Sequence, residues 1–237
     1  MPRKAGITCP GPSMKKNAPL WQYLVPGLGI GLFILLVSIE FAISEKFGLD
    51  EAVLATAEKR YGPEARSRLL DWVALISDQG GSDHDKLTRV NDFFNRYDFV
   101  SDNVHWQIED YWATPVEFIA SDGGDCEDFS LAKYFTLKAM GVQENKLNLT
   151  YVKALSLDQA HMVLTYFEKP GAEPLVLDNL VGEIKPATER TDLLPVYSFN
   201  GSGLWIAKQR GRGQLVGKSD RLSRWQELLN RMPQGLN

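Results

Sequence analysis

Cysteine is scarce in this chain, with only 2 among 237 residues. Cys9 lies in an N-terminal segment that precedes an apolar stretch, so Cys126 is the single thiol of the main body. If the N-terminal segment is removed, no intramolecular disulfide can form, which excludes a fold held by disulfides. An unpaired thiol in an oxidising compartment is a liability unless it is buried or used, so a chemical role for Cys126 gains weight.

An excess of basic charge is also absent. The net charge is −4 and the isoelectric point is near 5.5, so the chain lacks the electrostatic footprint of a nucleic-acid-binding protein. We therefore expect no nucleic-acid partner. Apolar residues make up 44% of the chain and charged residues 24%, which favours one large globular domain over disorder.

The first 44 residues have the composition of an export segment. A basic start leads into residues 24–37, which carry no charge and have the length of a signal-peptide core. The wider window 20–43 reaches the length of a membrane span but includes polar residues. We expect residues 1–44 to be a signal peptide or an N-terminal membrane anchor. Either would export the domain formed by residues 45–237.

Hydrophobic periodicity predicts an α+β domain in which helices pack on an antiparallel sheet. Residues 105–118 are rich in aromatics without a clean period, so we expect an ordered loop or short turns there. "NGSG" indicates a hairpin between the last two strands. Helices are predicted over 49–60, 63–76, 84–97, 126–140 and 219–232, and strands over 147–155, 160–167, 174–180, 196–199 and 204–207.

The stretch "GGDCEDFS", residues 123–130, surrounds the thiol with carboxylates. Asp125 is a good N-cap, which puts Cys126 in the first turn of a helix. Asp125, Glu127 and Asp128 all oppose ionisation of the thiol, because nearby negative charge disfavours a thiolate. The thiol is therefore inert unless positive charge offsets these acids.

Three histidines could act as a base for the thiol. His84 lies between two aspartates at a hydrophilic helix start, which favours a solvated role, and His105 lies in the aromatic loop, which favours packing. His161 instead opens an apolar strand, and Asp178 lies on the following strand. The turn at 168–173 lies midway between them, so an antiparallel hairpin would bring His161 and Asp178 opposite each other, or nearly so.

Cys126, His161 and Asp178 thus occur in the order of a thiol acyl-transfer site. Cys126 would attack a carbonyl, His161 would take and return the proton, and Asp178 would orient the imidazole. The alternative is a small buried cysteine beside a chance His–Asp pair. Spacing alone leaves both readings open.

Four ordered blocks of sequence resemble a known family. "DYWATPVEF", "GGDCEDFS" followed by "KYF", "AHMVLTYF" and "LVLDNL" are similar to the bacterial transglutaminase-like cysteine proteinases of the LapG type, over about residues 91–180. The resemblance implies a transglutaminase-like, papain-related fold and a periplasmic cysteine endopeptidase. It also implies that the catalytic triad falls on Cys126, His161 and Asp178.

The same resemblance implies a metal, a substrate and a regulator. Family members depend on calcium, and their acidic ligands fall on Asp125 and Glu127, with Asp128 as a further candidate. Calcium takes oxygen ligands of this kind, although an acidic first turn also suits the helix dipole without any metal. The implied substrate is a large repeat adhesin, cut near its N-terminus after two alanines so that it leaves the outer membrane and the biofilm disperses. The implied inhibitor is an inner-membrane receptor for cyclic diguanylate.

Two other functions remain open on the sequence. The same fold could transfer the acyl group to an amine instead of water, as transglutaminases do. The chain could also be a non-catalytic exported binding domain with a buried cysteine. We expect hydrolysis first, transfer second and binding third.

Overall fold

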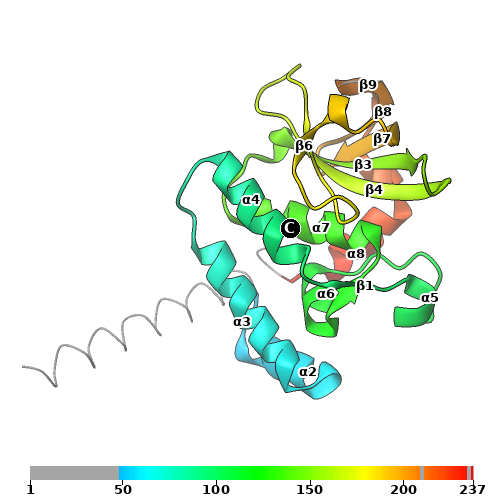
Figure 1. Cartoon of the computed structure of the whole chain (residues 1–237). Helices are drawn as coiled ribbons and strands as arrows, with labels where there is room; N and C mark the ends of the chain where they lie inside the picture. The colour runs from blue at the N-terminus through cyan, green and yellow to red at the C-terminus, as the bar shows by residue number, and fades with distance from the viewer. Residues whose placement is uncertain (1–47, 209–210, 234–235, 237) are drawn as a thin grey trace, which may run out of the picture. The chain divides into compact units, whose positions relative to one another are not determined.

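The computed structural model describes residues 48–208, 211–233 and 236, and the expected export segment lies outside them. Most helices of the described part precede the sheet in the chain (Figure 1). None of these helices is long and apolar enough to cross a membrane. The α-helices are α2 (Glu51–Tyr61), α3 (Pro63–Ser77), α4 (Asp83–Phe94), α5 (Asp102–His105), α6 (Pro115–Ser121), α7 (Cys126–Ala139) and α8 (Ser223–Arg231).

A seven-stranded sheet has the order β6-β5-β4-β3-β7-β8-β9, and every neighbouring pair is antiparallel. The predicted α+β class is therefore confirmed, as is the hairpin, in which Asn200 pairs with Gly203. The strands of this sheet are β3 (Leu147–Ala154), β4 (Gln159–Tyr166), β5 (Leu175–Leu177), β6 (Lys185–Pro186), β7 (Leu193–Asn200), β8 (Gly203–Lys208) and β9 (Gly211–Gly217). A separate parallel pair joins β1 (Asp98–Phe99) to β2 (Gly123–Gly124).

The expectation of a loop or turns over residues 105–118 is partly wrong, because α6 begins at Pro115. The Thr114 hydroxyl accepts a hydrogen bond from the Glu117 N–H at 3.2 Å, and Oε2 of Glu117 accepts one from the Thr114 N–H at 2.8 Å. This reciprocal pair is a capping box, and Pro115 occupies the first helical position, where a missing N–H does no harm. The sequence "TPVE", residues 114–117, therefore contains the signal for the start of this helix.

Several strands also differ from the prediction. β5 ends at Leu177 instead of continuing to residue 180, β7 begins at Leu193 instead of residue 196, and β1, β2, β6 and β9 were not predicted. The sequence of β9, "GRGQLVG", is rich in glycine, which has low strand propensity, so local pattern gave no strand signal there.

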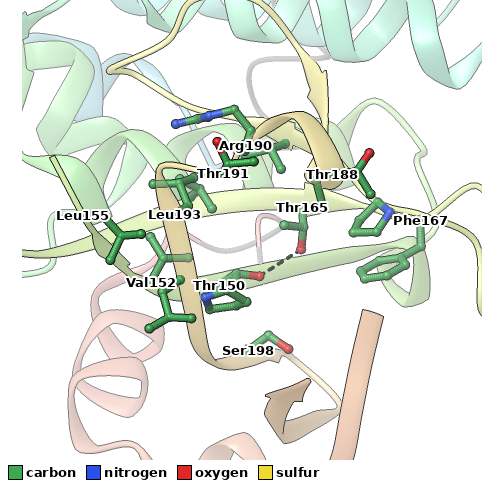
Figure 2. A pocket seen from close by; sticks show the side chains of 16 residues that line it. Thr150, Val152, Leu155, Thr165, Phe167, Thr188, Arg190, Thr191, Leu193 and Ser198 are labelled. Carbon is green, nitrogen blue, oxygen red and sulfur yellow. Dashed lines mark hydrogen bonds between the residues drawn. The ribbon is translucent and has the colours of Figure 1, made fainter. Parts of the chain in front are cut away.

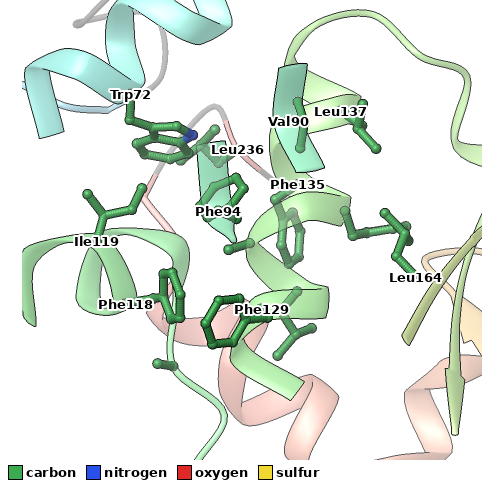
Figure 3. Close-up of a cluster of buried hydrophobic side chains, with 14 of the residues drawn as sticks. Trp72, Val90, Phe94, Phe118, Ile119, Phe129, Phe135, Leu137, Leu164 and Leu236 are labelled. Atoms are coloured by element: carbon green, nitrogen blue, oxygen red, sulfur yellow. The ribbon is translucent and has the colours of Figure 1, made fainter. Parts of the chain in front are cut away.

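The core surrounds α7, which packs between α3, α4 and α6 on one side and β3 and β4 on the other. Residues 128–137 of this helix are all buried. Figure 3 shows the aromatic side chains that fill the helical side, among them Phe94, Phe118 and Phe129. Burying a side chain of this size stabilises the fold by about 1.5–3 kcal/mol. Because α7 is covered on both sides, its first residue, Cys126, is held at a fixed place beside β4.

The other face of the sheet carries a second, smaller apolar cluster of Val152, Val163 and Val176. A cavity of about 390 Å³ lies between these strands and residues 187–195 (Figure 2). Inside it the hydroxyls of Thr150 and Thr165 are 2.9 Å apart. Because side chains alternate along a strand, this cavity is separated by the sheet from the core around α7.

Candidate active site

Cys126 is the first residue of α7, and Asp125 is the N-cap, as the sequence predicts. Two glycines allow the chain to reach this start. A Cβ on Gly123 would lie 2.3 Å from the carbonyl oxygen of Asp98, and a Cβ on Gly124 would lie 2.3 Å from the carboxylate of Asp128. Only glycine permits these approaches, so "GGDC" fixes both the β1–β2 contact and the start of the helix.

The thiol of Cys126 donates a hydrogen bond to Oε2 of Glu127 at 3.0 Å. Burial raises the pKa of Cys126 well above its ordinary value, and the negative charges of Glu127 and Asp125 raise it further. The backbone N–H of Met162 opposes these effects only in part. Without a compensating positive charge, the thiol therefore stays protonated, as the acidic surroundings in the sequence predicted.

His161 and Asp178 form a buried pair. His161 lies on β4 and Asp178 directly follows β5, and Nε2 of His161 is 2.8 Å from Oδ1 of Asp178. The two residues are only 3% and 1% exposed. The predicted contact is present, although the predicted register is wrong by two residues, since Leu164 pairs with Leu177. A shift of two residues keeps each side chain on the same face of the sheet, so the pair still forms.

The Asp178 carboxylate has two further donors. The N–H of Leu180 donates to Oδ1 at 3.0 Å, and Nη2 of Arg190 donates to Oδ2 at 2.7 Å. Burial alone would raise the pKa of Asp178, but the hydrogen bonds and charge of His161, with these two donors, lower it to about 2. Asp178 is therefore ionised at neutral pH. Arg190 was missed by sequence reasoning, because an arginine in "ATERTD" has no local signal for this role.

A cleft of about 760 Å³ is lined by Cys126 and His161 together. Aromatic side chains form much of its wall: Trp112, Tyr151 and Tyr197. The rings of Tyr151 and Tyr197 stack with centroids 5.1 Å apart. A cleft of this size, with aromatic and charged side chains in its wall and a nucleophile beside an imidazole, suits a peptide segment as ligand.

Three carboxylates meet beside the start of α7. Asp102, Asp125 and Asp128 each offer an oxygen, and these oxygens lie within 4.8 Å of one another. Oδ1 of Asp102 and Oδ1 of Asp125 are buried without a hydrogen-bond partner in the described part of the chain. Burial raises the pKa of all three, that of Asp102 to about 6, and nearby negative charge, first that of Glu127, raises each further. Such a cluster is stable only with protons or a cation to offset the charge.

Glu127 also approaches Asp125. The carboxylates of Asp125 and Glu127 form a second group with the Cys126 thiol, again within 4.8 Å. Asp128 also has a structural task, since its Oδ1 accepts from the Ala113 N–H at 2.6 Å. Asp102 was missed by sequence reasoning, because it comes from the distant helix α5 and no motif marks it.

A profile of the bacterial transglutaminase-like cysteine proteinases matches residues 75–207 of this chain. The chain belongs to this family. The matched segment contains every candidate catalytic and acidic residue described above. The bacterial transglutaminase-like cysteine proteinase fold expected from the sequence is therefore confirmed, with helices packed on an antiparallel sheet.

Two solved structures of a bacterial transglutaminase-like cysteine proteinase are similar along most of the chain. LapG of Legionella pneumophila, treated with EGTA, is 44% identical, with a TM-score of 0.68, and covers 77% of this chain and 96% of its own. Calcium-bound LapG of the same organism is 43% identical, with a TM-score of 0.65, and covers 76% of this chain and 97% of its own. A search of curated proteins gives no significant match.

The remaining histidines lie as the sequence suggested. His84 is exposed at the start of α4. Nε2 of His105 is 2.8 Å from the Ser121 hydroxyl, and its ring contacts Trp106 edge-on. Neither histidine lines the cleft that contains Cys126.

Proposed function

We propose that the protein is an exported, calcium-dependent cysteine endopeptidase that uses Cys126, His161 and Asp178. The observation that carries this proposal is the cleft itself. Its wall contains a thiol at a helix start and an imidazole whose far nitrogen is bonded to a buried, ionised aspartate. Membership of a cysteine proteinase family supports the same chemistry.

The proposed reaction begins with proton transfer from Cys126 to Nδ1 of His161, while Nε2–H remains bonded to Asp178. The sulfur then forms a bond to the scissile carbonyl carbon, and the carbonyl electron pair moves to oxygen. The backbone N–H of Cys126, at the helix start, is the donor we assign to that oxyanion. As the intermediate collapses, the C–N bond breaks, the leaving amine takes the proton from His161, and a thioester remains. Water, activated by His161, then hydrolyses the thioester and restores the thiol.

A calcium ion fits the acidic cluster. The buried, unpaired oxygens of Asp102 and Asp125 are hard ligands of the type that calcium takes, and Asp128 and Glu127 complete the candidate set. A bound calcium ion supplies positive charge beside the thiol. Asp125 and Glu127 would hold the ion together, and a Glu127 carboxylate engaged in this way would no longer accept the hydrogen bond from the Cys126 thiol. The calcium-bound structure of LapG supports this assignment.

The substrate, location and regulator are proposed from the family resemblance. We propose a large repeat adhesin, cut near its N-terminus after two alanines, as the substrate in the periplasm. We also propose that an inner-membrane receptor for cyclic diguanylate sequesters the enzyme. The N-terminal segment, as signal peptide or inner-membrane anchor, would deliver the domain to that compartment.

Mass spectrometry of the products tests the reaction type. The full chain is incubated with calcium, an adhesin fragment containing a double alanine, and an excess of a primary amine. Hydrolysis predicts two fragments whose masses sum to the substrate plus one water. An amine adduct on the new C-terminus would instead support transfer, and an unchanged fragment would contradict both enzymatic readings.

A further inference from the structure

Lys133 is a fully buried lysine on α7, about two turns beyond Cys126, with 1% of its surface exposed. Its ammonium nitrogen lies 2.9 Å from Oδ1 of Asn91, 2.7 Å from Oδ1 of Asn95 and 3.1 Å from the backbone oxygen of Asp178. These three acceptors match the three N–H donors of a charged lysine, whereas a neutral amine has only two. All three N–H donors of the side chain are therefore satisfied within one polar network.

The two asparagines extend this network to the segment that follows β5. Asn91 lies in the last turn of α4 and Asn95, four residues later, is the C-cap of that helix, so their side chains share a face. Because Lys133 holds both Oδ1 atoms, both amide nitrogens are turned toward the 178–182 segment. Nδ2 of Asn95 donates to the Asp178 oxygen at 2.9 Å, and Nδ2 of Asn91 donates to the Gly182 oxygen at 2.7 Å.

This network supplies hydrogen bonds to the backbone where the strand β5 has ended. β5 ends at Leu177, so the backbone of Asp178 lies outside the β4–β5 ladder. Its carbonyl instead accepts from Lys133 and Asn95, while its carboxylate accepts from His161 and Arg190. The main chain and the side chain of Asp178 are thus held by separate sets of hydrogen-bond donors. A substitution can therefore remove the donors to the main chain and leave the donors to the carboxylate in place.

A role in folding alone is the competing explanation for Lys133. Burial lowers the pKa of Lys133 to about 7, even though the charge of Asp178 raises it. A buried charge of this kind contributes little to stability compared with an apolar side chain of the same volume. Methionine has a similar length and would suit the apolar surroundings of α7. Stability therefore does not explain why the network converges on the Asp178 carbonyl.

We propose that Lys133, together with Asn91 and Asn95, is a positioning residue for the His161–Asp178 pair. It ties the main chain at Asp178 to α7, the helix that carries Cys126. One rigid helix thereby sets the place of both the nucleophile and the aspartate. The catalytic consequence rests on the proposed function, but the effect on the histidine does not.

The test compares Lys133→Met with a matched control on the same helix. Thr136→Val removes another fully buried polar group of α7, whose hydroxyl accepts from Nε1 of Trp72 at 2.8 Å and has no bond to the 178–182 segment. With the full chain, calcium and the adhesin fragment, Lys133→Met is expected to lower kcat about 10–100-fold with little change in KM. Thr136→Val is expected to keep kcat within about twofold.

A second variant covers the case in which Lys133→Met does not fold. Asn95→Asp keeps the acceptor for Lys133 and removes the N–H donor to the Asp178 oxygen. It is expected to lower kcat in the same way. Wild-type kcat in Asn95→Asp, or equal losses in Lys133→Met and Thr136→Val, would overturn the proposal.

A measurement without substrate separates this proposal from the proposed function. The full chain is labelled with ¹⁵N-histidine, and its three imidazoles are assigned with single His→Gln variants. Spectra are recorded at a pH at which the imidazoles are neutral. Wild type and Thr136→Val should then show the His161 proton on Nε2, whereas Lys133→Met and Asn95→Asp should show a mixture of tautomers. An unchanged Nε2–H signal in Lys133→Met would overturn the positioning role even if the enzyme cleaves. A mixture of tautomers would support it even if no adhesin is cut.

Discussion

Nε2 of His161 lies 2.8 Å from Oδ1 of Asp178, and both side chains are buried. Since Asp178 is ionised, it accepts a hydrogen bond and holds the imidazole proton on Nε2. Nδ1 is then the nitrogen that can receive a proton from the cleft, and the resulting imidazolium is stabilised by the aspartate.

Asp178→Asn should abolish most of the activity while the fold persists. An amide can donate to the imidazole, which favours the wrong tautomer, so we expect kcat to fall about 10³–10⁴-fold. Steady-state cleavage of the adhesin fragment measures this. Asp192→Asn is the matched control, because Asp192 also binds Arg190 but is partly exposed. Similar losses in both variants would show that the His161 contact is not the cause.

Arg190→Met should destabilise the fold. The variant leaves the buried carboxylate of Asp178 with one fewer charged partner, and breaking a buried ion pair costs about 3 kcal/mol. Urea unfolding followed by circular dichroism measures the change. Arg224→Met, which breaks the exposed pair with Asp110, should change the free energy of unfolding by less than about 1 kcal/mol. A smaller effect at Arg190 than at Arg224 would contradict the assignment.

Acid should remove the contribution of Asp178 to the free energy of unfolding. Its pKa is lowered to about 2 in the folded state, against about 3.9 in an unfolded chain. The folded state therefore binds this proton less readily, and the stabilisation is present above about pH 4 and lost as the pH falls through about 2. The difference in unfolding free energy between wild type and Asp178→Asn should shrink by about 2–3 kcal/mol from pH 6 to pH 2. A difference that stays constant with pH would contradict this account.

The acidic cluster predicts the opposite pH dependence of stability. Burial, with the charges of Glu127 and Asp110, raises the pKa of Asp102 to about 6. Its ionised form therefore destabilises the calcium-free protein at neutral pH, and stability in chelator should rise as the pH falls from 7 toward 4. Asp102→Asn should raise Tm in chelator and reduce the Tm increase caused by calcium, because a ligand is lost.

Differential scanning calorimetry with and without calcium measures both effects. Asp98→Asn, at an exposed position of β1, is the control and should behave as wild type. If Asp102→Asn keeps the full calcium-induced increase in Tm, Asp102 is not a ligand.

Residues whose environment is local could be predicted from the sequence. "GGDCEDFS" specified a capped helix with Cys126 in its first turn, and strand alternation with the 168–173 turn brought His161 to Asp178. The two-residue error in register arose because the turn length alone does not fix which residues pair. It did no harm, since side chains alternate with a period of two.

The residues that were missed act across the fold. Asp102 joins Asp125 and Asp128 only because α5 and the start of α7 meet in space. Lys133 lies within the helix predicted over residues 126–140, and its contact with Asp178 depends on how α7 packs beside the end of β5. No spacing rule connects such residues, because tertiary packing decides their neighbours.

The most direct test of the central claim is cleavage by Cys126→Ala. Full-length wild type, Cys126→Ala and Thr136→Val are incubated with calcium and the double-alanine adhesin fragment, and the products are identified by mass spectrometry. We predict two fragments with wild type and with Thr136→Val, and intact substrate with Cys126→Ala. Fragments from Cys126→Ala at the wild-type rate would contradict a thiol nucleophile in this cleft.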